Sequence, residues 1–197
     1  MINPLVKERI AESISVKHQL LENEVLLDTV SRLADAIVEC INCGGKLVLC
    51  GNGGSASDAL HFAGEIVGRF VKERKAWPAV VLNADVATMT AIANDYGYDD
   101  VFARQAEGHL KPGDMFIGIS TSGNSENVYR ALLKAKEIGA RTACLVGKDG
   151  GKIGREVDFP IIVPCQVTAR VQECHINLIH ILCEIAEKKL TEVETEV

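Results

Sequence analysis

The sequence lacks any hydrophobic run long enough to cross a membrane, and aromatic residues make up only 5% of it. Positive charge is not in excess either, because 21 lysines and arginines face 27 aspartates and glutamates and leave a formal net charge of −6. This balance disfavours nucleic acid and anionic membranes as partners. The 197 residues are 47% hydrophobic, which is enough for one sizeable core, and nothing in the length requires a second domain.

We expect no secretory leader, because residues 1–13 alternate charged and apolar side chains instead of forming a continuous apolar segment. The seven cysteines are odd in number, and several lie inside apolar runs such as residues 47–50 and 143–146. This pattern predicts reduced, buried thiols in a cytoplasmic protein. Cys40 and Cys43 have the C-x-x-C spacing, but a redox or structural zinc role is disfavoured without a second pair or a preceding thioredoxin-like strand.

Helical periodicity in residues 3–41, ended by Gly44 and Gly45, predicts one broken helix or two. After Lys46, short β-branched runs alternate with helical patterns, which predicts an α/β fold with a parallel sheet covered by helices on both faces. The expected strands are residues 46–50, 78–82, 115–119, 142–146 and 159–163, and the expected helices between them are residues 55–71, 86–93 and 125–138.

A last helix is expected over residues 168–190, with a broad apolar face and lysines at its end, and the acidic residues 191–197 are expected to fray. We therefore predict a single domain over residues 1–197. It comprises an N-terminal helical segment (1–43), an α/β core (44–167) and a C-terminal helix (168–190). Long apolar helices at both ends suggest packing against other subunits.

A glycine-rich loop, residues 51–58 (GNGGSASD), follows the first expected strand. Ser55 and Asp58 form an S-x-x-D capping signature, so we expect a helix to begin at Ser55. Strand, glycine turn and helix N-terminus together create a site for an anion such as phosphate, although a simple capped turn has the same pattern. The loop also fits the dinucleotide fingerprint G-x-G-x-x-A, but no acidic residue stands about 20 positions on at the end of the next strand, which disfavours NAD.

A second polar loop, residues 120–125 (STSGNS), follows the third expected strand. Its four hydroxyls can donate to phosphate oxygens together with backbone amides, so a phosphate could be held without any lysine. A serine-rich turn that only caps the next helix remains the alternative. Two such loops at the carboxyl ends of strands in one sheet favour the anion site.

Three side chains in the helix after the first loop, His61, Glu65 and Arg69, are spaced four residues apart and are expected on one helical stripe. Such a stripe is also typical of a solvated helix face. In the C-terminal helix, polar side chains interrupt the apolar pattern at Gln172, His175 and His180, and a histidine there is either a buried structural residue or a functional one.

The residues His61, Glu65, Gln172 and His180 could supply nitrogen and oxygen ligands to one divalent cation, and zinc suits two imidazoles and a carboxylate. Gln172 makes this ligand set unusual. It stands eight residues before His180, which separates their Cα atoms by about 12 Å along an ideal helix and puts joint ligation near the limit of reach.

Four segments resemble, in order, the motifs of the phosphoheptose isomerases of the SIS superfamily, and the resemblance covers nearly the whole chain. They are GNGGSASDALHFAGE (51–65), AIANDYG (91–97), GISTSGNSENV (118–128) and ARVQECHINLIHIL (169–182). The resemblance implies a three-layer flavodoxin-like sheet and a homotetramer with active sites shared between subunits. It also implies interconversion of sedoheptulose 7-phosphate and D-glycero-D-manno-heptose 7-phosphate, a precursor of heptose-containing glycans such as lipopolysaccharide or capsule.

The family's site residues carry over to matching positions of this sequence. The resemblance implies phosphate binding by Ser120, Thr121, Ser122 and Ser125, and further substrate contacts from Asn52, Gly53, Gly54, Ser55, Glu65, Arg69, Asn94, Asp95 and Gln172. It implies one zinc ion per subunit, held by His61, Glu65, Gln172 and His180. Some members have an aspartate where this chain has Ala169. Glu65 is our candidate catalytic base and His180 our candidate acid, because aldose–ketose isomerisation needs both.

Three other functions are compatible with a SIS fold. The main alternative is a non-catalytic scaffold of the replication-initiator-associating type, which the presence of Glu65 together with His180 disfavours. A sugar-phosphate-sensing regulator would need a DNA-binding domain or a basic patch, and neither is apparent in the sequence. An isomerase of the arabinose 5-phosphate type normally carries additional regulatory domains after the SIS unit.

Overall fold

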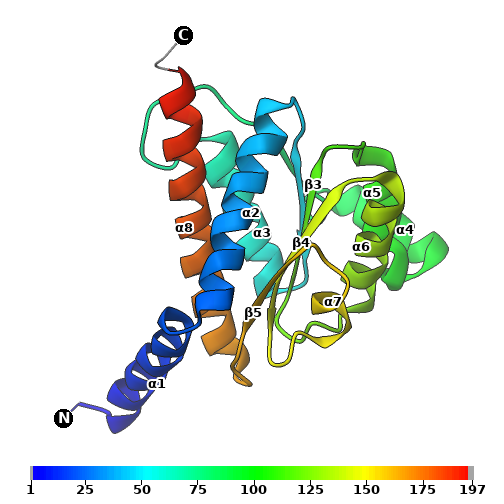
Figure 1. Ribbon diagram of the computed structural model, residues 1–197. Helices are drawn as coiled ribbons and strands as arrows, with labels where there is room; N and C mark the ends of the chain where they lie inside the picture. The colour runs from blue at the N-terminus through cyan, green and yellow to red at the C-terminus, as the bar shows by residue number, and fades with distance from the viewer. Residues whose placement is uncertain (1, 195–197) are drawn as a thin grey trace.

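The computed structural model describes residues 2–194, in which helices and strands alternate from the first strand onward (Figure 1). The helices are α1 (Pro4–Leu21), α2 (Glu24–Asn42), α3 (Gly54–Val67), α4 (Val86–Tyr96), the 3-10 turn η1 (Tyr98–Asp100), α5 (Val101–His109), α6 (Glu126–Ile138), α7 (Gly151–Gly154) and α8 (Thr168–Glu194). The strands are β1 (Leu47–Gly51), β2 (Ala79–Val81), β3 (Met115–Ser120), β4 (Arg141–Gly147) and β5 (Phe159–Val163).

The five strands form one parallel sheet in the order β2-β1-β3-β4-β5, which is the flavodoxin-like order and confirms the predicted fold class. The chain runs outward from β1 to β2 and then returns to place β3 on the other side of β1. The strand order therefore reverses between β1 and β3. Ligands of open parallel sheets bind at the carboxyl ends of the strands beside such a reversal, which is where both polar loops of this chain begin.

Two apolar cores lie on opposite faces of the sheet. Alternate residues of β1 divide between them, because Leu47 and Leu49 join one core while Val48 and Cys50 join the other. The first core also contains residues of α2, α3 and α8, and the second contains residues of α5, α6 and α7. Figure 1 shows the same three layers, with α2, α3 and α8 on one side of the sheet and α4, α5, α6 and α7 on the other.

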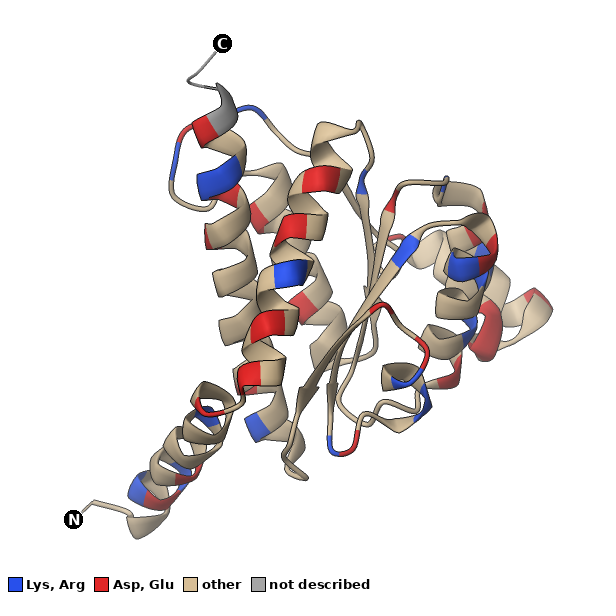
Figure 2. Ribbon diagram, viewed as in Figure 1, with Lys and Arg blue, Asp and Glu red and all other residues tan. Residues whose placement is uncertain are grey.

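Helix α1 extends away from the sheet at the N-terminal end of the chain (Figure 1). It buries only Val16 and Leu20 and leaves larger apolar side chains such as Ile10 and Ile14 exposed. Arg170 of α8 ties α1 to the body, since its Nη1 atom donates to Glu12 Oε2 at 3.1 Å. Acidic and basic residues are interspersed over the helices (Figure 2). No helix within residues 2–194 is both long and apolar enough to cross a membrane.

Several predicted boundaries differ from the structure. Helix α3 begins at Gly54, capped by Gly53, and Ser55 forms no capping hydrogen bond, so the predicted S-x-x-D capping box is wrong. Helix α8 continues to Glu194, four residues beyond the predicted end, while the remainder of the predicted frayed tail, residues 195–197, lies outside the described residues. Helix α5 was not predicted, because its nine residues are too few to establish a period.

Candidate active site

Three polar side chains from two helices meet beside the sheet. His61 and Glu65 lie four residues apart on α3, and His180 projects from α8. The Nε2 atoms of His61 and His180 are 2.9 Å apart, and Glu65 Oε1 is 3.2 Å from His61 Nε2. The side chain of His61 is 45% exposed and that of Glu65 is 24% exposed, so the cluster is open to a ligand while its members are held by their helices.

This arrangement fits a metal ion. The ligand atoms of His61, Glu65 and His180 all lie within 4.8 Å of one another. Two imidazole nitrogens and a carboxylate oxygen form a donor set typical of zinc. Imidazole nitrogens that face each other so closely also need either a shared proton or a cation between them. The predicted fourth ligand, Gln172, has its amide nitrogen against the backbone of Gly54, where an added Cβ atom would lie 2.2 Å from it.

Two further acidic groups, those of half-buried Asp58 and buried Cys183, lie close to the cluster. Asp58 precedes His61 by one turn of α3, and burial raises the pKa of its carboxyl above the ordinary value, although the charge of His61 lowers it. Its Oδ2 atom is buried and has no hydrogen-bond partner. Burial also raises the pKa of Cys183 to about 12, with a further contribution from Glu65. Cys183 is therefore a neutral thiol at neutral pH and leaves Glu65 as the acidic member of the cluster.

The first polar loop forms a tight turn between β1 and α3. Gly53 has a φ of +57°, which favours glycine, and it stands at the N-cap of α3. The loop is held from β2, since the Asn83 side chain accepts from Gly51 N at 3.2 Å and donates to Ala56 O at 3.4 Å. Ser55 is buried behind the turn. The amides of Ser55 and Ala56 donate within the turn, to Asn52 O and Gly53 O at 3.0 Å each, so an anion at this helix start would depend on the amides that precede Ser55.

The second polar loop gathers hydroxyl groups at the carboxyl end of β3. Ser120 Oγ lies 2.8 Å from Ser125 Oγ and 3.4 Å from Ser122 Oγ. Ser125 is the N-cap of α6 but makes no capping hydrogen bond with its side chain, so a ligand would compete for this hydroxyl with Ser120 and not with the helix. Thr121 is half-buried beside these serines, and its carbonyl packs against Gly147. Three of the four hydroxyls predicted to bind phosphate, those of Ser120, Ser122 and Ser125, therefore lie together, and their binding of phosphate stays a prediction.

Asn127 joins the two loops and was not predicted as a site residue. It is buried at 3% exposure and makes a reciprocal amide pair with Asn52, with N–O distances of 2.9 and 3.0 Å. The hydroxyl of Tyr98 adds a third contact by donating to Asn52 Oδ1 at 2.9 Å. The only sequence signal was that Asn127 continues the polar run of the second loop, and a single asparagine inside a helix does not reveal a partner 75 residues away.

Three other predicted site residues, Arg69, Asn94 and Asp95, make side-chain contacts with residues close to them in the sequence. Helix α3 ends at Val67, so Arg69 is not on the predicted helical stripe; its exposed side chain lies 3.9 Å from Glu73. Asn94 and Asp95 are exposed near the end of α4, where Asn94 Nδ2 donates to Asp95 Oδ1 at 2.8 Å.

His175 is the buried structural histidine that the sequence left as one alternative. Its Nε2 atom lies 3.2 Å from the carbonyl oxygen of Val146, its Nδ1 atom has no hydrogen-bond partner, and burial lowers its pKa to about 4. It is therefore a neutral imidazole at neutral pH. Among the two histidines of α8, only His180 faces the cluster on α3.

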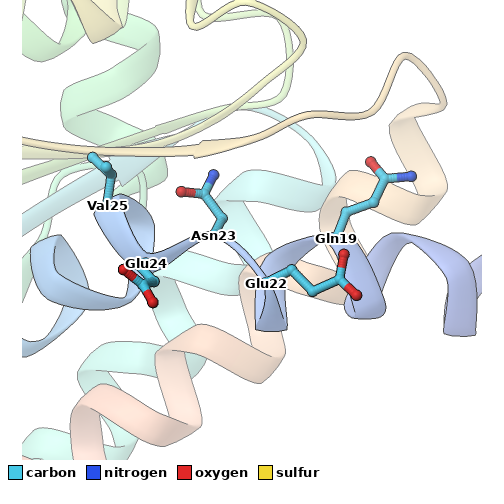
Figure 3. A pocket seen from close by; sticks show the side chains of 5 residues that line it. All are labelled: Gln19, Glu22, Asn23, Glu24 and Val25. Atoms are coloured by element: carbon cyan, nitrogen blue, oxygen red, sulfur yellow. The ribbon is translucent and has the colours of Figure 1, made fainter.

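A separate hollow lies at the bend between α1 and α2 (Figure 3). The side chains that line it are Gln19, Glu22, Asn23, Glu24 and Val25. Two carboxylates in this lining disfavour a phosphorylated ligand, because the negative charges repel each other. The hollow shares no residue with the cluster of His61, Glu65 and His180, so we do not assign the chemistry to it.

Residues 10–147 match the SIS domain family. The phosphoheptose isomerase of Geotalea daltonii is 48% identical over 185 residues, which span 93% of this chain and 96% of that protein. The structure of a phosphoheptose isomerase from Neisseria gonorrhoeae is similar with a TM-score of 0.87 at 41% identity, over 93% of this chain and 97% of that one. A phosphoheptose isomerase from Francisella tularensis gives 0.90 at 33% identity, over 95% and 100%. This chain belongs to the phosphoheptose isomerase family of SIS-domain proteins.

Proposed function

We propose that this protein is an aldose–ketose isomerase that converts D-sedoheptulose 7-phosphate to D-glycero-D-manno-heptose 7-phosphate, for the synthesis of heptose-containing glycans such as lipopolysaccharide or capsule. The observation that carries the proposal is the cluster of Glu65, His61 and His180, in which Glu65 lies 3.2 Å from His61 and the two imidazoles lie 2.9 Å apart. Relatives that are named phosphoheptose isomerase and align over nearly the whole chain support the choice of substrate.

The isomerisation needs a base at carbon and an acid at oxygen. In the ketose-to-aldose direction, Glu65 removes a proton from C1 while His180 donates a proton to the oxygen on C2, which gives a cis-enediol. Glu65 then returns the proton to C2, and His180 takes the proton from the oxygen on C1, so that the carbonyl forms there. The atoms balance without an oxidant or a reductant.

A zinc ion, one per subunit, would be held by His61, Glu65 and His180, with Gln172 as the fourth ligand. When bound, it supplies a positive charge that polarises the substrate carbonyl. Glu65 has two carboxylate oxygens and His180 has two ring nitrogens, so in each residue one atom could serve as a ligand while the other exchanges the proton. The 3.2 Å separation of Glu65 Oε1 and His61 Nε2 supports this ligand set, because tetrahedral zinc with bonds of about 2.0–2.1 Å brings its ligands to about 3.3 Å from one another.

The phosphate is bound by the second polar loop. Ser120, Thr121, Ser122 and Ser125 donate hydroxyl groups, and the start of α6 adds backbone amides and the positive end of a helix dipole. The first loop, at Asn52, Gly53, Gly54 and Ser55, binds the sugar together with Gln172. Asn94, Asp95 and Arg69 complete the substrate contacts.

The protein works as a homotetramer with shared active sites, in the cytoplasm. The exposed apolar face of α1, which includes Leu5, Ile10 and Ile14, supports the assembly, because an amphipathic helix that projects from a domain is stabilised by a partner. The seven cysteines are all free thiols, which supports a reducing compartment. Arg69 is exposed and so is available to contact a sugar bound partly by a neighbouring subunit.

The test is to incubate the purified, metal-assayed protein with sedoheptulose 7-phosphate in D2O and to follow the aldoheptose phosphate by NMR. Conversion establishes the isomerase, and deuterium at C2 of the product would show that the proton on Glu65 exchanges with solvent before it is returned, as the enediol route allows. Absence of conversion with zinc supplied would favour the alternative, a non-catalytic SIS scaffold of the replication-initiator-associating type.

A further inference from the structure

A buried ion pair outside the candidate site joins the end of α3 to α8. Arg74 Nε donates to Glu187 Oε1 at 3.1 Å, and the two side chains are only 1% and 4% exposed. Arg74 also stacks on Trp77, with the guanidinium carbon 3.5 Å from the ring centroid. Neither residue belongs to the ligand set or to the two polar loops.

Arg74 holds the last turn of α3 through its main chain. Its Nη2 atom donates to Glu65 O at 2.8 Å, and its Nη1 atom lies 3.0 Å from Ile66 O and 3.2 Å from Gly68 O. These carbonyls stand at the end of a helix, where backbone partners run out and a cation is favoured by the helix dipole. The guanidinium thus fixes the backbone of Glu65 itself, the residue proposed as the base.

Glu187 holds the segment that follows α3. Its carboxylate accepts from three successive backbone amides, those of Phe70, Val71 and Lys72, at 2.9–3.0 Å. Burial by itself raises the pKa of this carboxyl, but the amides and Arg74 lower it below its ordinary value, so the carboxylate stays charged. With Arg74 as a fourth donor, both oxygens are fully used.

The same contacts reach His180 from the other side. Glu187 stands seven residues after His180, which is about two turns of α8 and therefore the same helical face. The ring of Phe70, whose amide Glu187 binds, lies 5.9 Å from the ring of His180. Glu65 and His180 are thus each linked by a short chain of buried contacts to one ion pair.

A buried ion pair is a weak source of stability, because the cost of removing two charges from water offsets much of their attraction. The role of this pair is better explained by the geometry that it imposes on α3 and α8. We propose that Arg74 and Glu187 are positioning residues that hold Glu65 opposite His180, an inference that rests on the isomerase function proposed above. Neither residue touches the substrate; both act through the backbone of residues 65–72.

The test compares Glu187→Gln and Arg74→Lys with a matched control, Asp114→Asn. Asp114 is also a fully buried carboxylate that binds a lysine and two backbone amides, those of Lys46 and Lys111, but it precedes β3, the central strand of the sheet, and these partners lie outside α3 and α8. It therefore reports on loss of stability alone. The measurements are kcat and KM well below the melting temperature, and the imidazole nitrogen shifts of His61 and His180 by NMR.

We expect Glu187→Gln and Arg74→Lys to lower kcat by about 10- to 100-fold with KM changed much less, since small misplacements of a catalytic group act on the chemical step. Both variants should also shift the imidazole resonances. Asp114→Asn should lower the melting temperature and leave kcat and the resonances as in the wild type. If Glu187→Gln and Arg74→Lys behave like Asp114→Asn, the pair is only structural and the proposal is wrong.

Two outcomes, a variant that does not fold and a wild type without isomerase activity, would each remove one part of this test. Should Glu187→Gln fail to fold, Arg74→Lys decides, because it keeps the charge beside Glu187 but its three donors on one nitrogen cannot reproduce the five contacts of the planar guanidinium. Should the wild type show no isomerase activity, the proposed function fails, and the imidazole resonances alone decide whether Arg74 and Glu187 position the cluster.

Discussion

His61 and His180 face each other with 2.9 Å between their Nε2 atoms, although 119 residues of chain separate them. Neither histidine, considered on its own helix, indicates a functional site. The meeting arises because α3 and α8 both pack on the same face of the sheet, and it turns two isolated imidazoles and Glu65 into a site with acid, base and ligand capacity.

Replacing the proposed base should abolish turnover without unfolding the protein. Glu65→Gln keeps the shape of the side chain and removes its ability to take a proton, so kcat should fall by about 10²- to 10⁴-fold. The measurement is conversion of sedoheptulose 7-phosphate by NMR, with circular dichroism to verify the fold. Glu73→Gln, an identical change at an exposed site, should match the wild type; equal activity of both variants would refute the role of Glu65.

Loss of one hydroxyl in the second polar loop should weaken phosphate binding. Ser125→Ala removes no capping hydrogen bond of α6, so its effect reports on the ligand rather than on the helix. A hydrogen bond to a charged group contributes about 1.5–3 kcal/mol, which predicts a rise in KM of at least about tenfold with kcat little changed. Inorganic phosphate should inhibit this variant less than the wild type. Ser57→Ala, at an exposed position of α3, serves as the control, and an unchanged KM in Ser125→Ala would contradict the phosphate site.

Loss of the amide pair between Asn52 and Asn127 should weaken substrate binding more than loss of the Tyr98 contact to the same asparagine. Asn127→Ala leaves both polar groups of Asn52 without this buried partner, and we expect a rise in KM together with a loss of about 1–3 kcal/mol in the free energy of unfolding. Tyr98→Phe removes one contact at an exposed residue and should have a smaller effect on both quantities. The prediction fails if Tyr98→Phe is the more damaging change.

Buried His175 should make the protein less stable in acid. Burial lowers its pKa from the ordinary 6.5 to about 4, so between these pH values the unfolded chain binds the proton and the folded chain does not. The free energy of unfolding should therefore fall as the pH drops from 6.5 to 4, by roughly 3 kcal/mol from this residue. Urea unfolding of wild type and His175→Gln across this range measures the difference. Parallel pH profiles for the two proteins would exclude His175 as the cause.

The exposed face of α1 should control assembly. Ile10→Glu with Ile14→Glu places two charges where apolar side chains are 58% and 55% exposed, so a monomer would tolerate the change while a subunit contact would not. Sedimentation velocity should show a tetramer for the wild type and smaller species for the variant. An unchanged sedimentation coefficient would place the subunit contacts elsewhere.

Local patterns were sufficient to predict much of this molecule. The β-branched runs after Lys46 predicted the five strands of the sheet, and the two polar loops follow β1 and β3 as predicted. Residues four apart, such as His61 and Glu65, share a helical face by geometry alone. The S-x-x-D signature was misleading, because the helix begins at Gly54 with Gly53 at the N-cap and no side-chain capping hydrogen bond.

Contacts between distant residues could not be predicted in the same way. Arg74 and Glu187 stand 113 positions apart, and each reads in the sequence as one more charge in a charged stretch. No pattern in the sequence indicates that both side chains are buried or that the Glu187 carboxylate accepts from three backbone amides. The extent of α3 was overestimated for the same reason, since the segment after Val67 leaves the helix to make these contacts.

Helix α8 contacts the rest of the site at three heights: Gln172 lies against the first loop, His180 faces His61, and Glu187 binds the segment after α3. A helix rotates by about 100° and advances 1.5 Å per residue, so one residue inserted between Gln172 and Glu187 would turn one of these contacts away from its partner. The loops that join the strands can change in length without this penalty. Across descendants of this chain, length variation should therefore accumulate at the loops and be excluded from residues 172–187 of α8, about four turns of helix.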